Sequence, residues 1–193
     1  MGESFSQKEL ERLLAELPAA RGFRAISLEM VGSSCDVARE CLIHRCAAVI
    51  LAGRQSAGRG RHGRNWVSDR LGNLYLSLAW PCRPELSRLG EWSLALAERI
   101  AAALHRHFDL SLAVKPPNDL LLDGKKVAGI LLEAIPWAGV AVGVGINLVE
   151  DPNLQSHCAQ PVGSLAQRRS LSLRDVLPPL LTALLQRDER WKS

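Results

Sequence analysis

The spacing of apolar residues changes along the chain between the periods of helices and of strands. Apolar residues recur at helical spacing over 6–17, where Ser6 and Glu9 form a capping box and Pro18 ends the segment. Residues 47–53 form an apolar, β-branched run, typical of a strand buried on both faces. The same reasoning predicts helices over 33–46, with Ser33 or Ser34 as the cap, and over 86–108, and strands over 23–30, 73–80, 112–115, 120–134 and 139–148.

Turn residues divide the second half of the chain. The dipeptide 123–124 is Asp-Gly, a strong hairpin signal, and 136–139 marks a second turn. Residues 149–163 show no periodicity and are rich in turn-forming types, so we predict a mobile loop. The chain is helical again from Ser172, but the proline pair 178–179 is expected to break that helix, so the main segment is predicted to begin there.

The predicted strands cluster in the middle of the chain, with helices before, between and after them. This order favours an α+β fold, with a mostly antiparallel mixed sheet and helices packed mainly on one face. The chain has 193 residues, of which 47% are apolar, enough for one domain with a hydrophobic core. We therefore expect a single domain over residues 1–193.

Charge and cysteine content narrow the class of protein. The net charge of +4 fits an anionic ligand or an acidic partner without demanding nucleic acid. The five cysteines form no CxxC pair, their number is odd and no signal peptide precedes them, so we expect reduced thiols in a cytoplasmic protein. The histidines do not lie at zinc-ligand spacing with these cysteines. No apolar run reaches about 18 residues, so a membrane span is not expected.

The segment SAGRGRHGRNW, residues 56–66, concentrates positive charge on a glycine-rich backbone. Four arginines fall within eleven positions with no carboxylate among them, so they repel one another unless an anion arrives: Arg54, Arg59, Arg61 and Arg64. Glycines let the backbone approach a ligand, so the segment predicts a phosphate or carboxylate cradle anchored by Trp66. A single-stranded nucleic-acid contact and a plain solvated loop are the alternatives. No P-loop pattern occurs, and the segment leads toward a strand rather than a helix, which excludes a dinucleotide fingerprint.

Two further motifs carry polar groups next to apolar strands. KPPND, residues 115–119, is a stiff polar corner, and Lys126 begins the strand after the hairpin. Lysines there could serve hairpin solubility alone. GVGINL, residues 143–148, lets a ligand approach the sheet, and its Asn147 offers an amide to an adenine edge. A glycine-rich strand packed under another element is the alternative.

Taken in order, RQSAGRGRHGRNW, KPPNDLLLDGKKVAGILLE and GVGINL resemble the catalytic domain of the biotin protein ligases. GSSCD at 32–36 and GNLYLSL at 72–78 are similar as well, so the resemblance covers roughly residues 24–190. It implies a fold like that of class II aminoacyl-tRNA synthetases. It also implies that ATP and Mg²⁺ activate biotin as biotinyl-5′-AMP, followed by transfer to one lysine of a biotin carboxyl carrier protein of a biotin-dependent carboxylase.

The resemblance also implies roles for individual residues. Arg61 and Arg64 would contact phosphates, Lys126 the carboxylate–phosphoryl junction, and Asn147 the adenine. Asp119 would orient the incoming lysine amine or the metal, with Mg²⁺ carried mainly by ATP. The implied biotin site comprises Ser33, Ser34, Gln55, Gly58, Arg59, Trp66, Gly129 and Ile130. The loop over 149–163 would close over the adenylate and exclude water.

The chain departs from the family's pattern at three places. Pro116 stands where tryptophan is usual, Cys35 stands where asparagine is common, and the chain stops at Ser193, so we expect the small C-terminal β domain to be absent. No DNA-binding helix-turn-helix fits before residue 24, so no repressor activity and no nucleic-acid partner are expected. A monomer and a homodimer both stay open.

Three other functions compete with a biotin ligase. A non-catalytic biotin-binding or sensing module is compatible with Pro116 and the missing domain. A lipoate or octanoyl ligase belongs to the same superfamily but lacks the arginine–glycine string. A single-stranded nucleic-acid binder would need several exposed aromatic side chains, whereas the chain has one tyrosine and three phenylalanines.

Overall fold

The computed structural model describes residues 4–83 and 85–186. Its four helices are α1 (Gln7–Glu16), α2 (Ser34–Ile43), α3 (Leu89–Phe108) and α4 (Leu173–Leu185). Its strands are β1 (Arg24–Val31), β2 (Ala48–Gln55), β3 (Leu74–Trp80), β4 (Ala113–Lys115), β5 (Asp119–Leu122), β6 (Lys125–Ile135) and β7 (Gly139–Ile146). Residues 1–3, 84 and 187–193, which the expected domain includes, lie outside the described residues.

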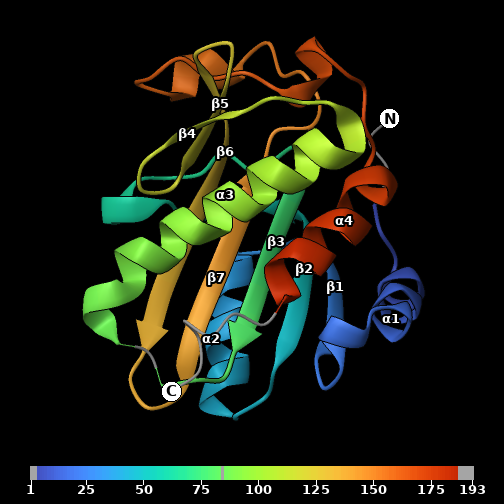
Figure 1. Ribbon diagram of the computed structural model, residues 1–193, viewed down its shortest axis with the longest axis vertical. Coiled ribbons are helices and arrows are strands. Elements are labelled where there is room, and N and C mark those ends of the chain that lie inside the picture. Colours follow the sequence, from blue (N-terminus) through green and yellow to red (C-terminus); the bar gives the residue numbers. More distant parts are fainter. Residues whose placement is uncertain (1–3, 84, 187–193) are drawn as a thin grey trace.

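The strands form one seven-stranded sheet in the order β1-β2-β3-β7-β6-β5-β4. Only β1 and β2 pair in parallel among these neighbours; every other pair is antiparallel. Helices α3 and α4 cover one face, α2 lies on the opposite face, and α1 lies beside β1 at the edge (Figure 1). The predicted α+β class, with a mostly antiparallel sheet, is confirmed.

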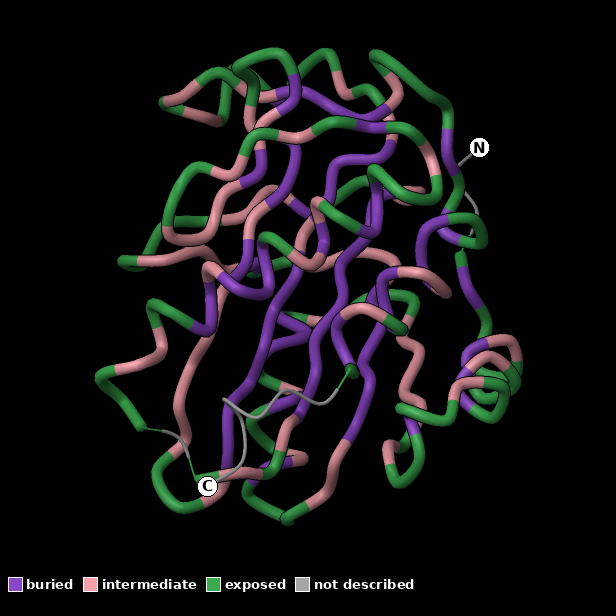
Figure 2. The backbone as a smooth tube through the Cα atoms, in the orientation of Figure 1, coloured by how far each residue is buried: buried purple, intermediate pink, exposed green. Residues whose placement is uncertain are grey.

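Strand β7 shows how the sequence sets the two faces of the sheet. Large residues alternate with small ones along it: Val140, Val142, Val144 and Ile146 join the core under α3 and α4, whereas Gly139, Ala141, Gly143 and Gly145 occupy the intervening positions. Successive side chains of a strand point to opposite faces, so the small residues leave the α2 side shallow. The middle of the sheet is buried throughout (Figure 2). This small-residue face is where the candidate site lies.

The first two helices begin differently. Ser6 and Glu9 form the predicted capping box, in which the Ser6 backbone N–H donates to the Glu9 carboxylate at 2.8 Å and the Glu9 N–H donates to Ser6 Oγ at 3.3 Å. Ser33 occupies the cap position of α2, but its hydroxyl makes no capping bond. The Ser33 side chain is therefore left for the pocket described below.

Helix α4 runs without interruption through Pro178 and Pro179, so the prediction that its main segment begins at the prolines is wrong. A second capping box, between Ser172 and Asp175, starts the helix. Prolines have no N–H to donate, but the carbonyls that they leave unpaired lie in the exposed first turn of the helix, where water can reach them. Burial of one apolar stripe of α4 outweighs the loss of these backbone hydrogen bonds. The stripe consists of Leu173, Val176, Leu177, Leu180, Leu181, Leu184 and Leu185.

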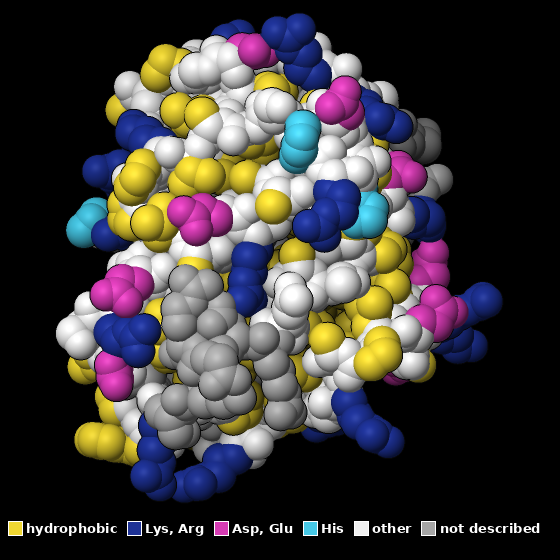
Figure 3. All heavy atoms as spheres, in the orientation of Figure 1, with side chains coloured by type: hydrophobic (Ala, Val, Ile, Leu, Met, Phe, Trp, Pro, Cys, Tyr) yellow, Lys and Arg dark blue, Asp and Glu magenta, His cyan; other side chains and the backbone are white. Residues whose placement is uncertain are grey.

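On the face seen in Figure 3, which carries α3 and α4, basic and acidic side chains are interspersed with apolar ones. Across the described ranges, no helix has both the length and the apolar composition that crossing a bilayer requires.

Candidate active site

The glycine–arginine segment folds as a small hairpin rather than an open loop. Its backbone pairs are Arg59 with Asn65, the Gly60 N–H with the Arg64 carbonyl at 2.7 Å, and the Trp66 N–H with the Gly58 carbonyl at 2.9 Å. The base of the hairpin is fixed by bonds from Ser56 and Ala57 to the end of β1 and the residue after it. Gly58 is required there, because a Cβ would clash with Ser68 Oγ and the Trp66 carbonyl.

Carboxylates that are distant in the sequence neutralise part of this arginine cluster. Arg59 lies 2.6 Å from the Asp36 carboxylate and 2.8 Å from that of Glu133, and Arg54 lies 3.6 Å from that of Glu29. The expectation that the cluster lacks compensating acids holds along the sequence but is wrong in three dimensions.

A pocket opens between this hairpin, the N-terminus of α2 and the small-residue face of the sheet. Its lining includes nine residues of the predicted site: Ser33, Ser34, Gln55, Arg59, Arg61, Trp66, Lys126, Gly129 and Ile130. It also includes residues to which the sequence assigned no ligand: Cys35, Gly60, Tyr75, Leu76, Asn118, Leu131, Gly143, Val144 and Gly145. The cavity volume is about 50 Å³. Ligand pockets are usually about 300–1,000 Å³, so the surrounding side chains must shift to admit a ligand.

Three glycines form the floor of the pocket. A Cβ on Gly129 would lie 3.0 Å from the Trp66 ring, and a Cβ on Gly145 would clash with the same ring. A Cβ on Gly143 would lie 2.6 Å from Cys35 Sγ. Trp66 and Cys35 can therefore pack against the sheet only because these positions are glycine. Burial raises the pKa of the Cys35 thiol, so this side chain is neutral at pH 7.

A buried hydrogen-bond network fixes the α2 side of the pocket. Gln55 Oε1 accepts bonds from the Ser34 N–H at 2.7 Å and from Ser34 Oγ at 2.9 Å, while Gln55 Nε2 donates to Ser68 Oγ at 3.0 Å. Ser34 Oγ lies 2.8 Å from Ser77 Oγ on β3. Both the Oε1 and the Nε2 of Gln55 are thus hydrogen-bonded within the protein, where they join the start of α2 to Ser68.

Three buried polar atoms of the pocket-lining residues have no hydrogen-bond partner among the described residues. They are Ser33 Oγ, on a residue that is 1% exposed, Arg59 Nε and Trp66 Nε1. Buried polar groups are nearly always paired in folded proteins, so each unpaired one needs an explanation. A polar ligand in this pocket would supply the partner.

Lys126 and Asp119 form an ion pair at one end of the pocket, with Nζ 2.8 Å from the carboxylate. The two side chains are 16% and 14% exposed, so little water screens them. The antiparallel pairing of β5 with β6, which carry the two residues, brings them together. Lys126 Nζ also lies 5.3 Å from the centroid of the Trp66 ring, within cation–π range.

Asn118 connects the hairpin to the sheet. Its Oδ1 accepts a hydrogen bond from the Arg61 guanidinium at 3.0 Å, and its Nδ2 donates to the Ile130 carbonyl at 3.0 Å. The Ile130 N–H in turn donates to the Asn118 carbonyl at 2.9 Å. The sequence placed Asn118 in a stiff corner but assigned it no contact, because nothing local shows that Arg61 lies beside it.

Four residues of the predicted site lie outside the pocket lining: Gly58, Arg64, Asp119 and Asn147. Arg64 is exposed, whereas Asn147 is only 4% exposed and its Nδ2 donates to the Gly163 carbonyl at 2.9 Å. The predicted contacts of Arg64 and Asn147 with ATP stay predictions.

The segment over 149–163 is tied to the sheet beside Lys126. The Lys126 N–H donates to the Pro161 carbonyl, and the Gly163 N–H donates to the Lys126 carbonyl, both at 2.9 Å. A 3₁₀ turn, Leu154–His157, interrupts the segment, and Leu154 is buried. The segment therefore lies next to the Lys126 end of the pocket, while its predicted mobility and closure stay predictions.

The chain resembles proteins of known activity. The model of the "Biotin/lipoate A/B protein ligase family" matches residues 46–148. A biotin–[acetyl-CoA-carboxylase] ligase of Paracoccus denitrificans is 42% identical over 117 residues, 55% of this chain and 47% of that protein. The bifunctional ligase/repressor BirA of Escherichia coli is 38% identical over 102 residues, 51% of this chain and 32% of that protein. The chain thus matches less than half the length of these relatives.

The chain is also similar in structure to a solved biotin protein ligase. The biotin protein ligase of Aquifex aeolicus in complex with biotin and ATP superposes with a TM-score of 0.69 and 28% identity, over 83% of this chain and 68% of that one. The α+β fold described above agrees with this likeness. Because the family model covers more than half of its residues, this chain belongs to the biotin/lipoate A/B protein ligase family.

Proposed function

We propose that this protein is an ATP-dependent ligase that activates biotin as biotinyl-5′-AMP and transfers the biotin to a lysine of a biotin carboxyl carrier protein. The observation that carries the proposal is the glycine-floored pocket, whose lining includes the Lys126 ammonium and the Arg61 guanidinium. Membership of the family supports it, as do relatives named as biotin ligases. We propose further that the chain is one catalytic domain of a cytoplasmic protein.

Positive charge is what the first half-reaction requires. The biotin carboxylate attacks the α-phosphorus of ATP and pyrophosphate leaves, so two anions must meet. At about 4 Å and an effective dielectric constant of about 20, two such charges repel by about 4 kcal/mol. Lys126 and Arg61 would offset this repulsion and stabilise the charge that develops on the phosphoryl oxygens. Asp119 and Asn118 hold these two cations in place.

Mg²⁺ is proposed to enter with the ATP phosphates and to neutralise part of their charge. The described residues contain no group of three or more histidine, cysteine or carboxylate side chains placed to hold a metal ion. Mg²⁺ commonly binds through substrate phosphates and one or two carboxylates, so its binding does not require a cluster of three protein ligands. Asp119 places a carboxylate at the proposed junction, through its contact with Lys126.

The pocket supplies partners for the polar head of biotin. The ureido group has two N–H donors and one carbonyl acceptor. The Ser33 hydroxyl can both donate and accept, and the Trp66 indole N–H can donate; both are unpaired among the described residues. The apolar valeryl chain is proposed to lie along the sheet near Gly129 and Ile130, beside the Trp66 ring.

Arg64 and Asn147 are proposed to contact the nucleotide, Arg64 through phosphate and Asn147 through the adenine. Since Asn147 Nδ2 is bonded to the Gly163 carbonyl, its Oδ1 is the atom that would accept a bond from the adenine amino group. The adjacent segment over 149–163 would exclude water from the reactive adenylate.

Labelled biotin tests the proposal. The protein is incubated with labelled biotin, ATP, Mg²⁺ and a biotin carboxyl carrier domain, and both pyrophosphate and protein-bound label are followed over time. A carrier domain whose acceptor lysine is replaced by arginine serves as the matched control for transfer. We expect pyrophosphate release that depends on biotin, and label on the unaltered carrier alone.

The other outcomes identify the alternatives. Biotin binding without pyrophosphate release would favour a non-catalytic sensing module. Pyrophosphate release with lipoate or octanoate but not with biotin would favour the other branch of the family. Absence of heat on titration with biotin, with and without ATP, would contradict the proposal outright.

A further inference from the structure

The C-terminal end of α2 forms a Schellman motif. The Cys46 N–H donates to the Cys41 carbonyl, and the Arg45 N–H donates to the Leu42 carbonyl, both at 2.8 Å. Arg45 has a φ of 53°, in the left-handed region that the motif requires one residue beyond the helix cap. The two bonds and the left-handed residue together identify the motif.

This motif places two cysteines side by side, because the Cys46 N–H bonds the Cys41 carbonyl. In Schellman motifs the closing residue frequently packs against the residue whose carbonyl it bonds, or against the residue before that one. Here the closing residue is Cys46 and the bonded carbonyl belongs to Cys41. Both are free cysteines of intermediate exposure. Burial raises the pKa of the Cys41 thiol, and the charge of the neighbouring Cys46 raises it further.

We propose that Cys41 and Cys46 form a redox-active thiol pair, which closes into a disulfide when it meets a small-molecule disulfide such as glutathione disulfide. The inference does not rest on the proposed ligase activity, because the pair lies at the opposite end of α2 from the pocket-lining residues Ser33 to Cys35. It identifies a reversible modification site at the end of the helix.

The exchange runs in two steps. The Cys46 thiolate attacks one sulfur of glutathione disulfide, forming a mixed disulfide and releasing one glutathione thiolate. Cys41 then loses its proton and attacks the Cys46 sulfur, which forms the protein disulfide and releases the second glutathione. Two protein thiols are oxidised and one glutathione disulfide is reduced to two glutathiones. Because burial disfavours the Cys41 thiolate, Cys41 is the second thiol to react.

Peptide mapping tests the proposal on the full chain. The reduced protein is incubated under native conditions with glutathione disulfide, denatured in iodoacetamide and digested with trypsin. Trypsin cleaves after Arg39, Arg45 and Arg54, so the expected product is residues 40–45 linked to residues 46–54. Dithiothreitol should separate the two peptides, and the oxidised protein should melt at a higher temperature than the reduced one.

Two variants sharpen the result. In Cys41→Ser no second thiol can attack the mixed disulfide on Cys46, so a glutathione should remain attached to Cys46. In Cys158→Ser the pair is intact, so the linked peptides should still form. If Cys41 and Cys46 stay fully alkylated, carry separate glutathiones, or link to another cysteine in the unaltered chain, the proposal is wrong.

Discussion

Lys126 Nζ lies 2.8 Å from the Asp119 carboxylate, with both side chains mostly shielded from water. The β5–β6 hairpin alone brings the two residues together, because Asp119 begins β5 and Lys126 is the second residue of β6. A mostly buried cation without a partner is costly, so the Asp119 carboxylate compensates the charge of Lys126.

Lys126→Gln should reduce biotin-dependent pyrophosphate release by about 100-fold or more, because it removes a fixed positive charge from the proposed reaction centre. Asp119→Asn should reduce the rate less. If the two residues act as a unit, the double variant is no slower than Lys126→Gln alone. Additive losses would instead show that Asp119 acts separately, for example on the acceptor lysine.

Arg61→Ala should raise the barrier to adenylate formation by about 2 kcal/mol or more, a rate loss of about 30-fold, because it removes a cation that Asn118 holds beside the pocket. Asn118→Ala should lower the rate by a smaller factor, since Arg61 keeps its charge but loses its position. Arg106→Ala removes the same charge from α3, on the other face of the sheet, and serves as the control. An unchanged activation rate in Arg61→Ala would exclude Arg61 from the mechanism.

Gly145→Ala should weaken both biotin binding and stability, because the added methyl group overlaps the Trp66 ring and forces it off the pocket floor. Overpacking of this kind costs about 1–3 kcal/mol of unfolding free energy. Urea denaturation and titration calorimetry with biotin measure the two effects. Gly90→Ala, in the first turn of α3, meets no atom within 4 Å and should stabilise the protein by about 0.5–1 kcal/mol. A Gly145→Ala variant that is as stable and as tight-binding as the parent would contradict the placement of Trp66.

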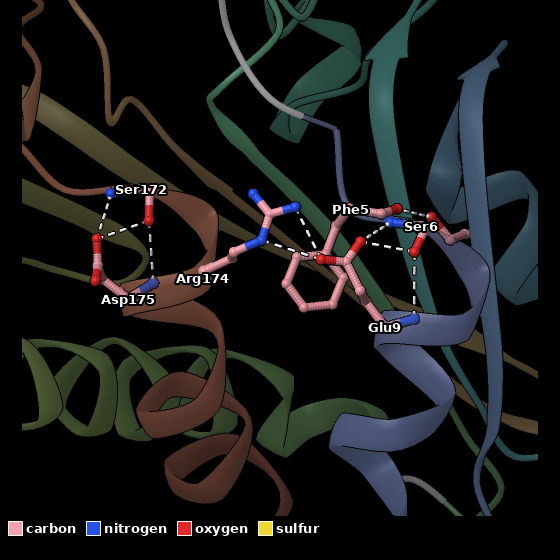
Figure 4. A network of polar contacts seen from close by, with 7 residues as sticks. Phe5, Ser6, Glu9, Ser172, Arg174 and Asp175 are labelled. Atoms are coloured by element: carbon pink, nitrogen blue, oxygen red, sulfur yellow. Dashed lines mark hydrogen bonds and ion pairs between the residues drawn. The ribbon is translucent and has the colours of Figure 1, made fainter.

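Stability should fall in acid through Glu9, which joins the start of α1 to the start of α4 (Figure 4). Hydrogen bonds from Ser6 and then Arg174 lower the pKa of Glu9 to about 2 from an ordinary value of 4.5. The folded state therefore keeps the carboxylate ionised where the unfolded chain has already bound a proton. The contribution of Glu9 is complete above pH 4.5 and is lost as the pH falls toward 2.

Melting temperatures between pH 6 and pH 2 measure this effect. The gap between the parent and Glu9→Gln should be widest near pH 6 and narrow toward pH 2. Glu98→Gln, at an exposed position on α3, is the control for removing a carboxylate. Parallel curves for the parent and Glu9→Gln would show that the ionised Glu9 carboxylate, bonded to Ser6 and Arg174, contributes nothing to the folded state.

Local pattern predicted most elements, because a helix or strand leaves its own period in the sequence. The Ser6–Glu9 capping box and the Asp123–Gly124 turn were read directly, and the turn has the positive φ angles that such hairpins use, 50° and 77°. The prediction was wrong for the start of helix α4. A local rule about prolines predicted a break, whereas the packing of its apolar stripe on the sheet and α3 maintained the helix.

The sequence alone determined the two faces of the central sheet, because strict alternation of large and small residues in β7 encodes a packed side and a shallow side. Only the tertiary structure decided the charge balance of the site. Arg59 forms ion pairs with Asp36 and Glu133, and Arg61 donates a hydrogen bond to Asn118. These partners lie too far apart in the sequence for local pattern to connect them. Periodicity is a property of neighbours along the chain, whereas Coulomb attraction and hydrogen bonding depend on distance through space, which the fold alone sets.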